Sequence, residues 1–425
     1  MKRSVLILVV AMLLSVANSW AQSGACGDNL TWRLSGAGDS YTLTISGSGV
    51  MDDYTRPTID GDNSRISPWF SYQTPVTNVI IEDGVTTIGE CAFIHCTRLS
   101  AVSMPNSLTS IRNNAFAWCS GLTAVTIPSS VTTIGEYAFA WCSGLSSVTI
   151  PNSVTAINDY VFAGCSGLAS IGVDDNNTNY SSEDGILFNK SKTTIVQYPA
   201  GKPDAAYIIS NSVTAIGYGA FAFCPNLSAV TIPSSVTTIG EMAFYGCSGL
   251  AAVTIPNSVT TIGNSAFSGC SGLTAVTIPS SVTTIEDWAF SGCTVLEEVT
   301  VEWTTPLDAP DGIFSQVNTS DATLLVPIGT KTLYQAAPVW KDFAIVEYDL
   351  TGNDNIHIPT LKAYASNGIL YISGLQPGKP LLVYTLSGQL VYQGLAKTAQ
   401  ESVAVATRGI YIIVSEKQTI KVIAN

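Results

Sequence analysis

Apolar and polar residues follow one another along most of this chain in a line of 23 positions that repeats. The line reads x-x-V-T-I-P-x-S-V-T-T-I-x-x-x-A-F-x-x-C-S-G-L, and eight stretches of the chain match it closely. A period of this length is typical of solenoids, in which each coil completes its hydrophobic core only by stacking on its neighbours. The phenylalanines that mark the coils are Phe93, Phe116, Phe139 and Phe162 and, after a spacing of 59 residues, Phe221, Phe244, Phe267 and Phe290.

Each part of the repeated line predicts one local element. The segment VTIP alternates as a half-buried strand does, with Val125 and Ile127 pointing inward and Thr126 outward, and its proline ends the strand. The segment SVTTI is a second short extended piece, rich in β-branched residues. The segment AFxxC suits one helical or 3-10 turn that buries Phe and Cys. The closing SGL supplies a glycine for the corner and a leucine for the core.

The sequence AVTIPSSVTTIGEYAFAWCSGL (124–145) resembles the BspA-like type of bacterial leucine-rich repeat, and GILFNKSKTTIVQYPAGK (185–202) resembles a variant coil of that family. The resemblance implies an α/β fold. The implied architecture is a right-handed leucine-rich-repeat solenoid with 23-residue repeats, a parallel sheet on one face and short helical or 3-10 turns on the other. We expect this solenoid to span residues 76–346, with variant coils at 169–215.

Both ends of the solenoid need a cap, because its terminal coils would otherwise expose core. Alternating runs predict a β-hairpin cap within residues 22–75, and a closing strand and short helix predict a second cap at 303–346. A polar linker follows at 347–360. Residues 361–425 then change to short alternating strands separated by turns, which predicts a C-terminal all-β sandwich.

This last segment is similar to the C-terminal sorting domain of the type IX secretion system of Bacteroidetes. The similarity rests on VYTLSGQLVYQG and RGIYIIV and on the ending IKVIAN. It implies that the type IX secretion machinery is a partner of this domain.

The N-terminal segment indicates where the protein is located, and the net charge limits its partners. Residues 1–21 have a short basic start, an apolar stretch and a plausible cleavage point at Ala21, as a signal peptide does. We therefore expect a secreted or outer-surface protein with no membrane span in the mature chain. The formal net charge of −13 argues against nucleic acid as a partner, because phosphate contacts need clustered Lys and Arg.

The inventory of catalytic groups is thin. The chain has two histidines, His95 in a repeat and His357 in the linker, and none of the common nucleophile, phosphate or zinc motifs. Cys91, His95 and Cys96 lie close together, but no second pair at zinc-site spacing accompanies them. We expect no cofactor, no metal and no enzyme activity.

One acidic stretch keeps an enzymatic alternative open. Residues 173–185 gather four carboxylates, which in pairs can serve glycoside hydrolysis or hold calcium. Under this alternative, the protein is a carbohydrate- or peptide-processing enzyme or accessory. The other interpretation is a solvated turn. The carboxylates are Asp174, Asp175, Glu183 and Asp184.

Eight of the ten cysteines occupy one position of the repeat. Stacked strands bring such neighbours to about 5 Å, within disulfide range. The position lies between AF and the corner glycine, so the thiols should point into the core, where free Cys acts as a small hydrophobe. We expect a reduced, inert ladder, with sporadic disulfides and a Cys26–Cys91 bond as alternatives. The ladder comprises Cys96, Cys119, Cys142, Cys165, Cys224, Cys247, Cys270 and Cys293.

Positions that vary from coil to coil are free of the stacking constraint, so recognition must use them. Aromatic residues gather in two such positions, just before and just after AF. They either shield the backbone between coils or offer rigid contact area for an extracellular protein or glycan. We therefore expect an exported binding protein, with adhesion to host proteins, matrix or glycans as its role. The candidates are Tyr137, Tyr160, Tyr218 and Trp288 in the first column and Trp118, Trp141, Phe223 and Tyr245 in the second.

Overall fold

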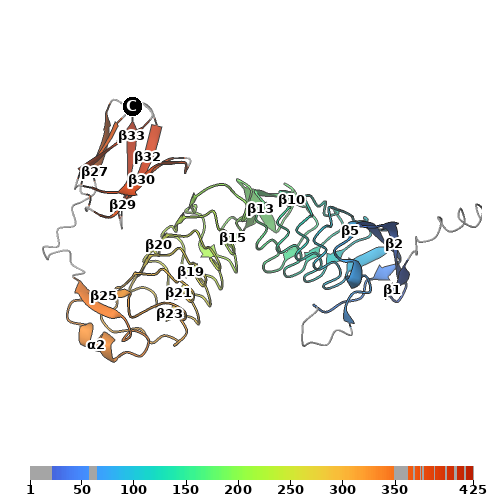
Figure 1. Ribbon diagram of the computed structural model, residues 1–425, viewed down its shortest axis with the longest axis horizontal. Helices are drawn as coiled ribbons and strands as arrows, with labels where there is room; N and C mark the ends of the chain where they lie inside the picture. The colour runs from blue at the N-terminus through green and yellow to red at the C-terminus, as the bar shows by residue number, and fades with distance from the viewer. Residues whose placement is uncertain are drawn as a thin grey trace, which may run out of the picture.

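The computed structural model describes residues 22–56, 65–348 and most of 362–424. The predicted signal peptide and His357 lie outside the described residues, as does nearly all of the predicted linker. In the described part, coils stack one after another in a single curved row (Figure 1). Most coils contribute one strand to each of two sides of the row and a turn to a third side.

The VTIP segments form the first sheet, as the alternation predicts. Its strands pair in parallel and exactly one repeat apart in most coils, so that Val230 lies beside Val253 and Val253 beside Val276. The sheet is divided twice, at the coil of Val125, which forms no regular strand, and again between Val173 and Ala206. Its strands are β5 (Val76–Ile81), β7 (Ala101–Ser103), β10 (Ser147–Ile150), β12 (Ser170–Val173), β16 (Ala206–Ile208), β18 (Ala229–Thr231), β20 (Ala252–Thr254), β22 (Ala275–Ile278) and β24 (Glu298–Val301).

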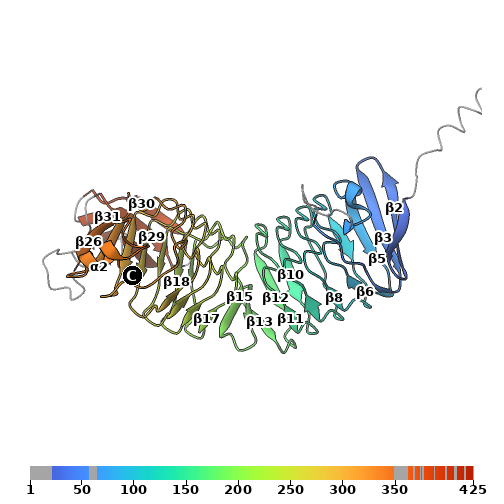
Figure 2. The same cartoon turned by 90° about the horizontal axis from the view of Figure 1, so that it is seen from below.

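The SVTTI segments form a second set of short parallel strands, which Figure 2 shows in one row along a single side of the molecule. Every strand of this set but one buries its isoleucine, as Ile134 and Ile262 illustrate, and the exception is the half-buried Ile157. These strands are β6 (Val85–Ile88), β8 (Ser110–Ile111), β9 (Thr133–Ile134), β11 (Ala156–Ile157), β15 (Thr194–Gln197), β17 (Ala215–Ile216), β19 (Thr238–Ile239), β21 (Thr261–Ile262) and β23 (Thr284–Ile285).

The AFxxC segments are hydrogen-bonded turns that carry almost no helix. Within the turn, Cys119 N donates to Phe116 O at 3.2 Å, as a 3-10 turn requires. Alternate amides instead donate to the following coil, so that Phe116 N meets Ala138 O at 2.8 Å and Trp118 N meets Ala140 O at 2.8 Å. The third side of the solenoid is therefore also tied from coil to coil by backbone hydrogen bonds.

The repeat phenylalanines form two stacks of buried rings. Trp69 begins the first stack, which continues from Phe93 to Phe162, and Tyr198 begins the second, which ends at Phe314. In the part of the chain that the structure describes, the buried residues of the coils divide accordingly into two solenoid cores. Within each stack, neighbouring rings lie 4.8 to 5.8 Å apart, which is the spacing of favourable aromatic pairs.

The two cores meet at the variant coil, which we call the junction. Here β13 (Tyr180–Glu183) and β14 (Ile186–Asn189) form an antiparallel hairpin, and β14 pairs antiparallel with β15. Ile186 belongs to one core and Leu187 to the other. The row of coils changes direction near β13 and β15 (Figure 1).

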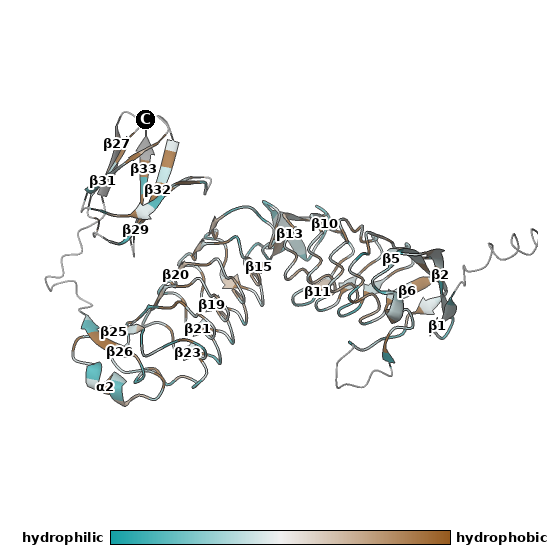
Figure 3. Cartoon of the chain, viewed as in Figure 1, coloured by the Kyte–Doolittle hydropathy of each residue, from teal (hydrophilic) through white to brown (hydrophobic). Residues whose placement is uncertain are grey.

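Caps close both ends of the solenoid. At the first end, β1 (Ser23–Gly27), β2 (Leu30–Ala37) and β3 (Ser40–Gly47) are antiparallel, β3 pairs in parallel with β5, and β4 (Gly49–Val50) pairs with β6. The 3-10 helix η2 (Phe70–Tyr72) follows. At the other end, the first sheet continues through β25 (Thr323–Pro327) and β26 (Ala344–Tyr348), which are joined by the largely hydrophilic helix α2 (Lys331–Ala336) (Figure 3).

The C-terminal segment forms two antiparallel sheets around a core of its own, as the predicted β-sandwich requires. Leu370 and Ile372 of one sheet and Leu381 and Val383 of the other are buried in this core. One sheet holds β27 (Lys362–Ser366), β28 (Ile369–Ser373) and β31 (Gln400–Ala404). The other holds β29 (Pro380–Thr385), β30 (Leu390–Leu395), β32 (Gly409–Ser415) and β33 (Gln418–Ala424).

Candidate functional site

Two positions of each repeat hold the backbone in the left-handed region. They lie two residues before and two residues after the repeat phenylalanine, as with Tyr137 (φ 54) and Trp141 (φ 56) around Phe139. Other coils place glycine there, and only glycine adopts this conformation without strain. We call the two sets the pre-Phe and post-Phe columns. The pre-Phe column is Cys91, Asn114, Tyr137, Tyr160, Gly219, Met242, Ser265 and Trp288, and the post-Phe column is His95, Trp118, Trp141, Gly164, Phe223, Gly246, Gly269 and Gly292.

Two of the predicted column members lie elsewhere in the register. Tyr218 occupies the position of Glu136, because its neighbour Gly219 donates to Glu241 O at 3.0 Å as a pre-Phe residue does. Tyr245 follows Phe244 directly, and its carbonyl oxygen accepts a hydrogen bond from Phe223 N at 2.7 Å. The assignment of these two tyrosines to the columns was wrong by one residue in each case. Counting from the repeat phenylalanine would have found the correct position.

The aromatic rings of each column stack along the solenoid. Trp118 and Trp141 lie 4.5 Å apart and nearly parallel, and His95 lies 5.8 Å from Trp118 at the end of the row. Tyr137 and Tyr160 stack at 4.8 Å in the other column. Their exposure differs widely, since Trp118 is 38% exposed and Tyr160 only 3%.

Packing between coils explains part of the aromatic pattern. A Cβ on Gly164 would lie 2.6 Å from the Trp141 ring, and one on Gly219 would lie 2.4 Å from the Tyr160 ring. A ring that leans over the next coil therefore requires glycine there. Trp118 leans instead against another tryptophan, and Trp288 remains 53% exposed. These two indoles present the open aromatic surface of the columns.

A row of acidic and amide side chains, interrupted by Tyr218, runs beside the pre-Phe column, three residues before each phenylalanine. Burial raises the pKa of Glu136, and the charges of Asp159 and Glu90 raise it further. Burial also raises the pKa of Asp159, although its side chain reaches solvent. In the described part of the chain, no Lys or Arg pairs with Glu136, Asp159 or Glu241. We call this row the acid column; its members are Glu90, Asn113, Glu136, Asp159, Tyr218, Glu241, Asn264 and Asp287.

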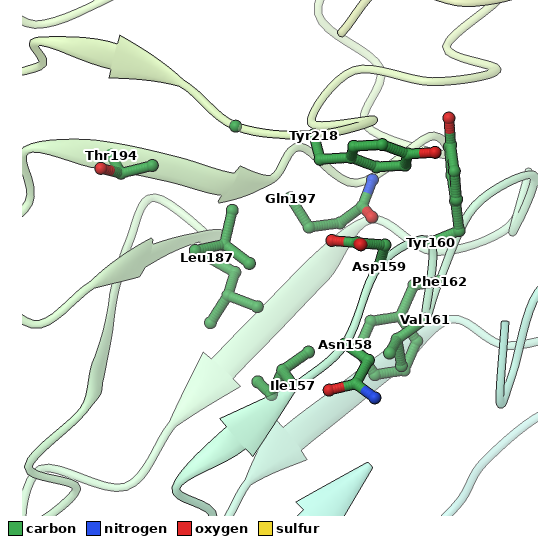
Figure 4. Close-up of a pocket in the computed structure, with 12 residues that line it drawn as sticks. Ile157, Asn158, Asp159, Tyr160, Val161, Phe162, Leu187, Thr194, Gln197 and Tyr218 are labelled. Carbon is green, nitrogen blue, oxygen red and sulfur yellow. The ribbon is translucent and has the colours of Figure 1, made fainter. Parts of the chain in front are cut away.

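The columns run past a cavity of about 170 Å³ at the junction, which we call the junction pocket (Figure 4). Phe162 and Leu187 form its buried wall, while Asn158 and Asp159 are exposed at its mouth. The Asp159 carboxylate points toward the middle of the pocket in Figure 4. Sequence reasoning did not find this pocket, because it forms between coils that are far apart along the chain.

Two tyrosines join the coils on either side of the junction pocket. Tyr160 and Tyr218 pack edge to face at 4.9 Å, and the Tyr160 hydroxyl donates to Met242 Sδ. The Tyr218 hydroxyl donates to Glu241 Oε1 at 3.5 Å. Burial raises the pKa of both phenols, so both hydroxyls carry their protons at neutral pH.

Most carboxylates of the acidic stretch 173–185 are engaged in local contacts. Asp174 Oδ1 accepts the Asn176 amide at 2.9 Å, as an Asx turn does. Glu183 pairs with Lys192 at 2.9 Å, and Asp184 pairs with Lys202 at 3.0 Å. Within the described ranges, no group of three His, Cys, Asp or Glu side chains is placed to hold a metal ion. These contacts fit the solvated turn, and no specific observation favours the enzymatic alternative.

The cysteine ladder is buried in the core between the coils. Each regular thiol donates to the carbonyl of the phenylalanine one coil earlier, as Cys142 Sγ does to Phe116 O at 3.2 Å. Burial raises the pKa of Cys96 to about 12, so the reactive thiolate is scarce at neutral pH. The structure shows Cys26 and Cys91 as free thiols, contrary to the bond considered between them.

Fold and repeat together define a leucine-rich-repeat solenoid, and comparison with known proteins identifies its family. The model of the BspA type leucine rich repeat region matches residues 66–193 and 205–320. The chain belongs to this family, whose members are generally binding proteins rather than enzymes.

Several solved structures are similar to this chain. A leucine-rich repeat protein from Eubacterium ventriosum is 27% identical with a TM-score of 0.54, over 70% of this chain and 95% of that one. A leucine rich cell surface protein from Faecalibacterium prausnitzii is 25% identical with a TM-score of 0.47, over 76% and 99%. The pneumococcal vaccine antigen PcpA shares the fold at 16% identity and a TM-score of 0.50, over 77% and 98%. No curated protein matches the sequence.

Among the residues that the structure describes, no helix has the length and apolar character needed to cross a bilayer.

Proposed function

We propose that this protein is exported and acts on the cell surface or in the medium as a non-enzymatic binding protein. Its role would be adhesion to a host protein, matrix component or glycan. The observation that carries the proposal is the open indole surface around Trp118, which stacks on Trp141 and is 38% exposed. Rigid aromatic surface of this kind is enriched at the energetic centres of binding interfaces.

The two ends of the sequence support export. Residues 1–21 have the pattern of a signal peptide, and the C-terminal β-sandwich has the sequence features of a type IX sorting domain. Under this proposal the secretion machinery is the partner of the C-terminal domain, while the solenoid meets the extracellular partner.

A binding array of extracellular-matrix proteins and glycans tests the proposal, with the mature chain 22–425 as the probe. The test variant replaces Tyr137, Trp118 and Trp141 with glycine, which suits the left-handed backbone at these positions. The control variant replaces Thr126, Thr149 and Thr254, which are the exposed threonines of three VTIP segments, with alanine.

We expect the wild-type chain and the threonine control to bind the same component of the array and the aromatic variant to lose it. A wild-type chain that binds nothing, or an aromatic variant that binds as well as the control, would contradict the proposal.

A further inference from the structure

The junction pocket lies where the regular contacts between coils stop. In a regular coil, Phe139 N donates to the following coil at 2.9 Å. At the junction the corresponding amides of Tyr160 and Phe162 meet no acceptor from a following coil within the described residues. The hydrogen bond from the ladder thiol to the preceding coil is also longer here. Cys224 Sγ lies 3.9 Å from Tyr198 O, whereas Cys142 Sγ lies 3.2 Å from Phe116 O in a regular coil. A ligand in the pocket would therefore meet backbone donors as well as side chains.

The pocket combines an apolar wall with an anionic mouth. Val161, Phe162 and Leu187 line it and are buried, and the exposed Asp159 carboxylate stands at its opening. The ring of Tyr218 lies above this carboxylate in Figure 4. An aliphatic stem with a cationic end fits this arrangement, because the stem can cover apolar wall while the charge meets a carboxylate and an aromatic face.

The surroundings of the pocket also favour a cation. Glu136 and Glu241 flank Asp159 and Tyr218 in the acid column, and no Lys or Arg pairs with them in the described part of the chain. Like charges in a row repel one another, and an incoming cation relieves that repulsion. A neutral sugar would leave the carboxylates uncompensated. A polypeptide supplies a cation together with carbonyl acceptors for the Tyr160 and Phe162 amides.

We propose that the junction pocket receives a lysine or arginine side chain of a partner polypeptide, with its cationic group against Asp159 and the ring of Tyr218. This inference rests on the proposed function, since it assigns a cationic protein segment as the partner chemistry. The Tyr160 ring, held by Tyr218 and Met242, forms the side of the pocket that faces the columns.

Fluorescence anisotropy with labelled octalysine, on the mature chain 22–425, tests the inference. The probes for comparison are octalysine with every side chain acetylated, which has no side-chain charge, and labelled maltohexaose, which represents a neutral glycan. The test variants are Asp159→Asn and Tyr218→Leu. The matched control is Asp175→Asn, which removes the same charge from an exposed position outside the pocket.

We expect octalysine to bind the wild-type chain and the Asp175→Asn control within twofold of each other. Asp159→Asn should weaken binding about tenfold and Tyr218→Leu about threefold, in line with one charge-assisted contact and one cation–π contact. Acetylated octalysine should not bind.

Three outcomes of the anisotropy experiment would overturn the inference. They are the absence of octalysine binding, equal affinities for Asp159→Asn and Asp175→Asn, and binding of maltohexaose or acetylated octalysine in place of octalysine. A Trp118→Gly variant that loses the array partner while Asp159→Asn retains it would refute the pocket and leave the proposed function standing. Melting temperatures of both aspartate variants establish that they are folded.

Discussion

At the scale of single residues, the backbone conformation decides which side chains the columns accept. The residues two positions from each phenylalanine have positive φ, and glycines, aromatic rings and a few smaller or flexible side chains occupy these positions. A non-glycine residue in this region costs about 1 kcal/mol or more. The stacking of Trp118 on Trp141 offsets part of that strain. The aromatic residues are thus held at a conformational cost that glycine would avoid.

Two glycine substitutions separate backbone strain from ring packing. At Gly269 (φ 72) a new Cβ would meet only ordinary contacts at 3.5 Å, so Gly269→Ala should cost about 1 kcal/mol from strain. At Gly164 (φ 68) the Cβ would lie 2.6 Å from the Trp141 ring, so Gly164→Ala should destabilise the chain further. Urea unfolding followed by circular dichroism measures both, and equal losses would contradict the packing account.

The cysteine ladder stabilises the stack through packing and a weak hydrogen bond. Cys142→Ala removes the Sγ contact with Phe116 O and leaves a small cavity, so we expect a loss of about 1–3 kcal/mol. Ser143→Ala, at the exposed neighbouring position, serves as the control and should change the unfolding midpoint little. An unchanged midpoint for Cys142→Ala would show that the ladder position tolerates loss of the thiol without penalty.

Asp159 should lower the free energy of unfolding at neutral pH, as expected of a side chain that serves binding at the expense of stability. Burial raises its pKa above the ordinary 3.8, so its ionised form opposes folding. This contribution disappears as the pH falls below 3.8, where the group is protonated both folded and unfolded. Asp159→Asn should therefore raise the melting temperature at pH 7 but not at pH 3. A decrease at pH 7, relative to Asp175→Asn, would mean that the carboxylate stabilises the fold.

At the scale of elements, the repeat predicts the strands well because each coil places the same residues in the same environment. The buried positions of Val125, Phe139 and Cys142 follow from the period alone, although the strand predicted at Val125 does not form. The assignment of Tyr218 and Tyr245 to the columns fails because each tyrosine lies directly before the glycine, Gly219 or Gly246, that occupies the column position. The junction pocket could not be predicted, since it depends on how the longer variant coil spans the gap between the two cores.

Hydrogen exchange measures the break in the backbone ladder directly. The amides of Tyr137 and Phe139 donate to the following coil at 3.1 and 2.9 Å. Those of Tyr160 and Phe162 meet no acceptor from a following coil among the described residues, so they should exchange about tenfold faster or more. Octalysine at saturating concentration should slow the latter pair. Equal protection of the two pairs of amides against exchange in the free chain would contradict the loss of hydrogen bonds between coils at the junction.

At the scale of the whole molecule, two regular stacks meet at a coil that breaks their ladders. The first stack carries the open surface at Trp118, and the second carries the other open indole, Trp288. The pocket lies between them at the junction. A partner that engages both the columns and the pocket would contact several coils at once, as solenoid ligands do.

Hydroxyl-radical footprinting of the mature chain with its array partner tests the central claim, that the aromatic columns form the binding surface. Trp118 and Tyr137 should lose reactivity in the complex, while Tyr371 of the C-terminal domain, 38% exposed, should keep it. Protection of Tyr371 with Trp118 unchanged would contradict the claim and place the partner on the C-terminal domain.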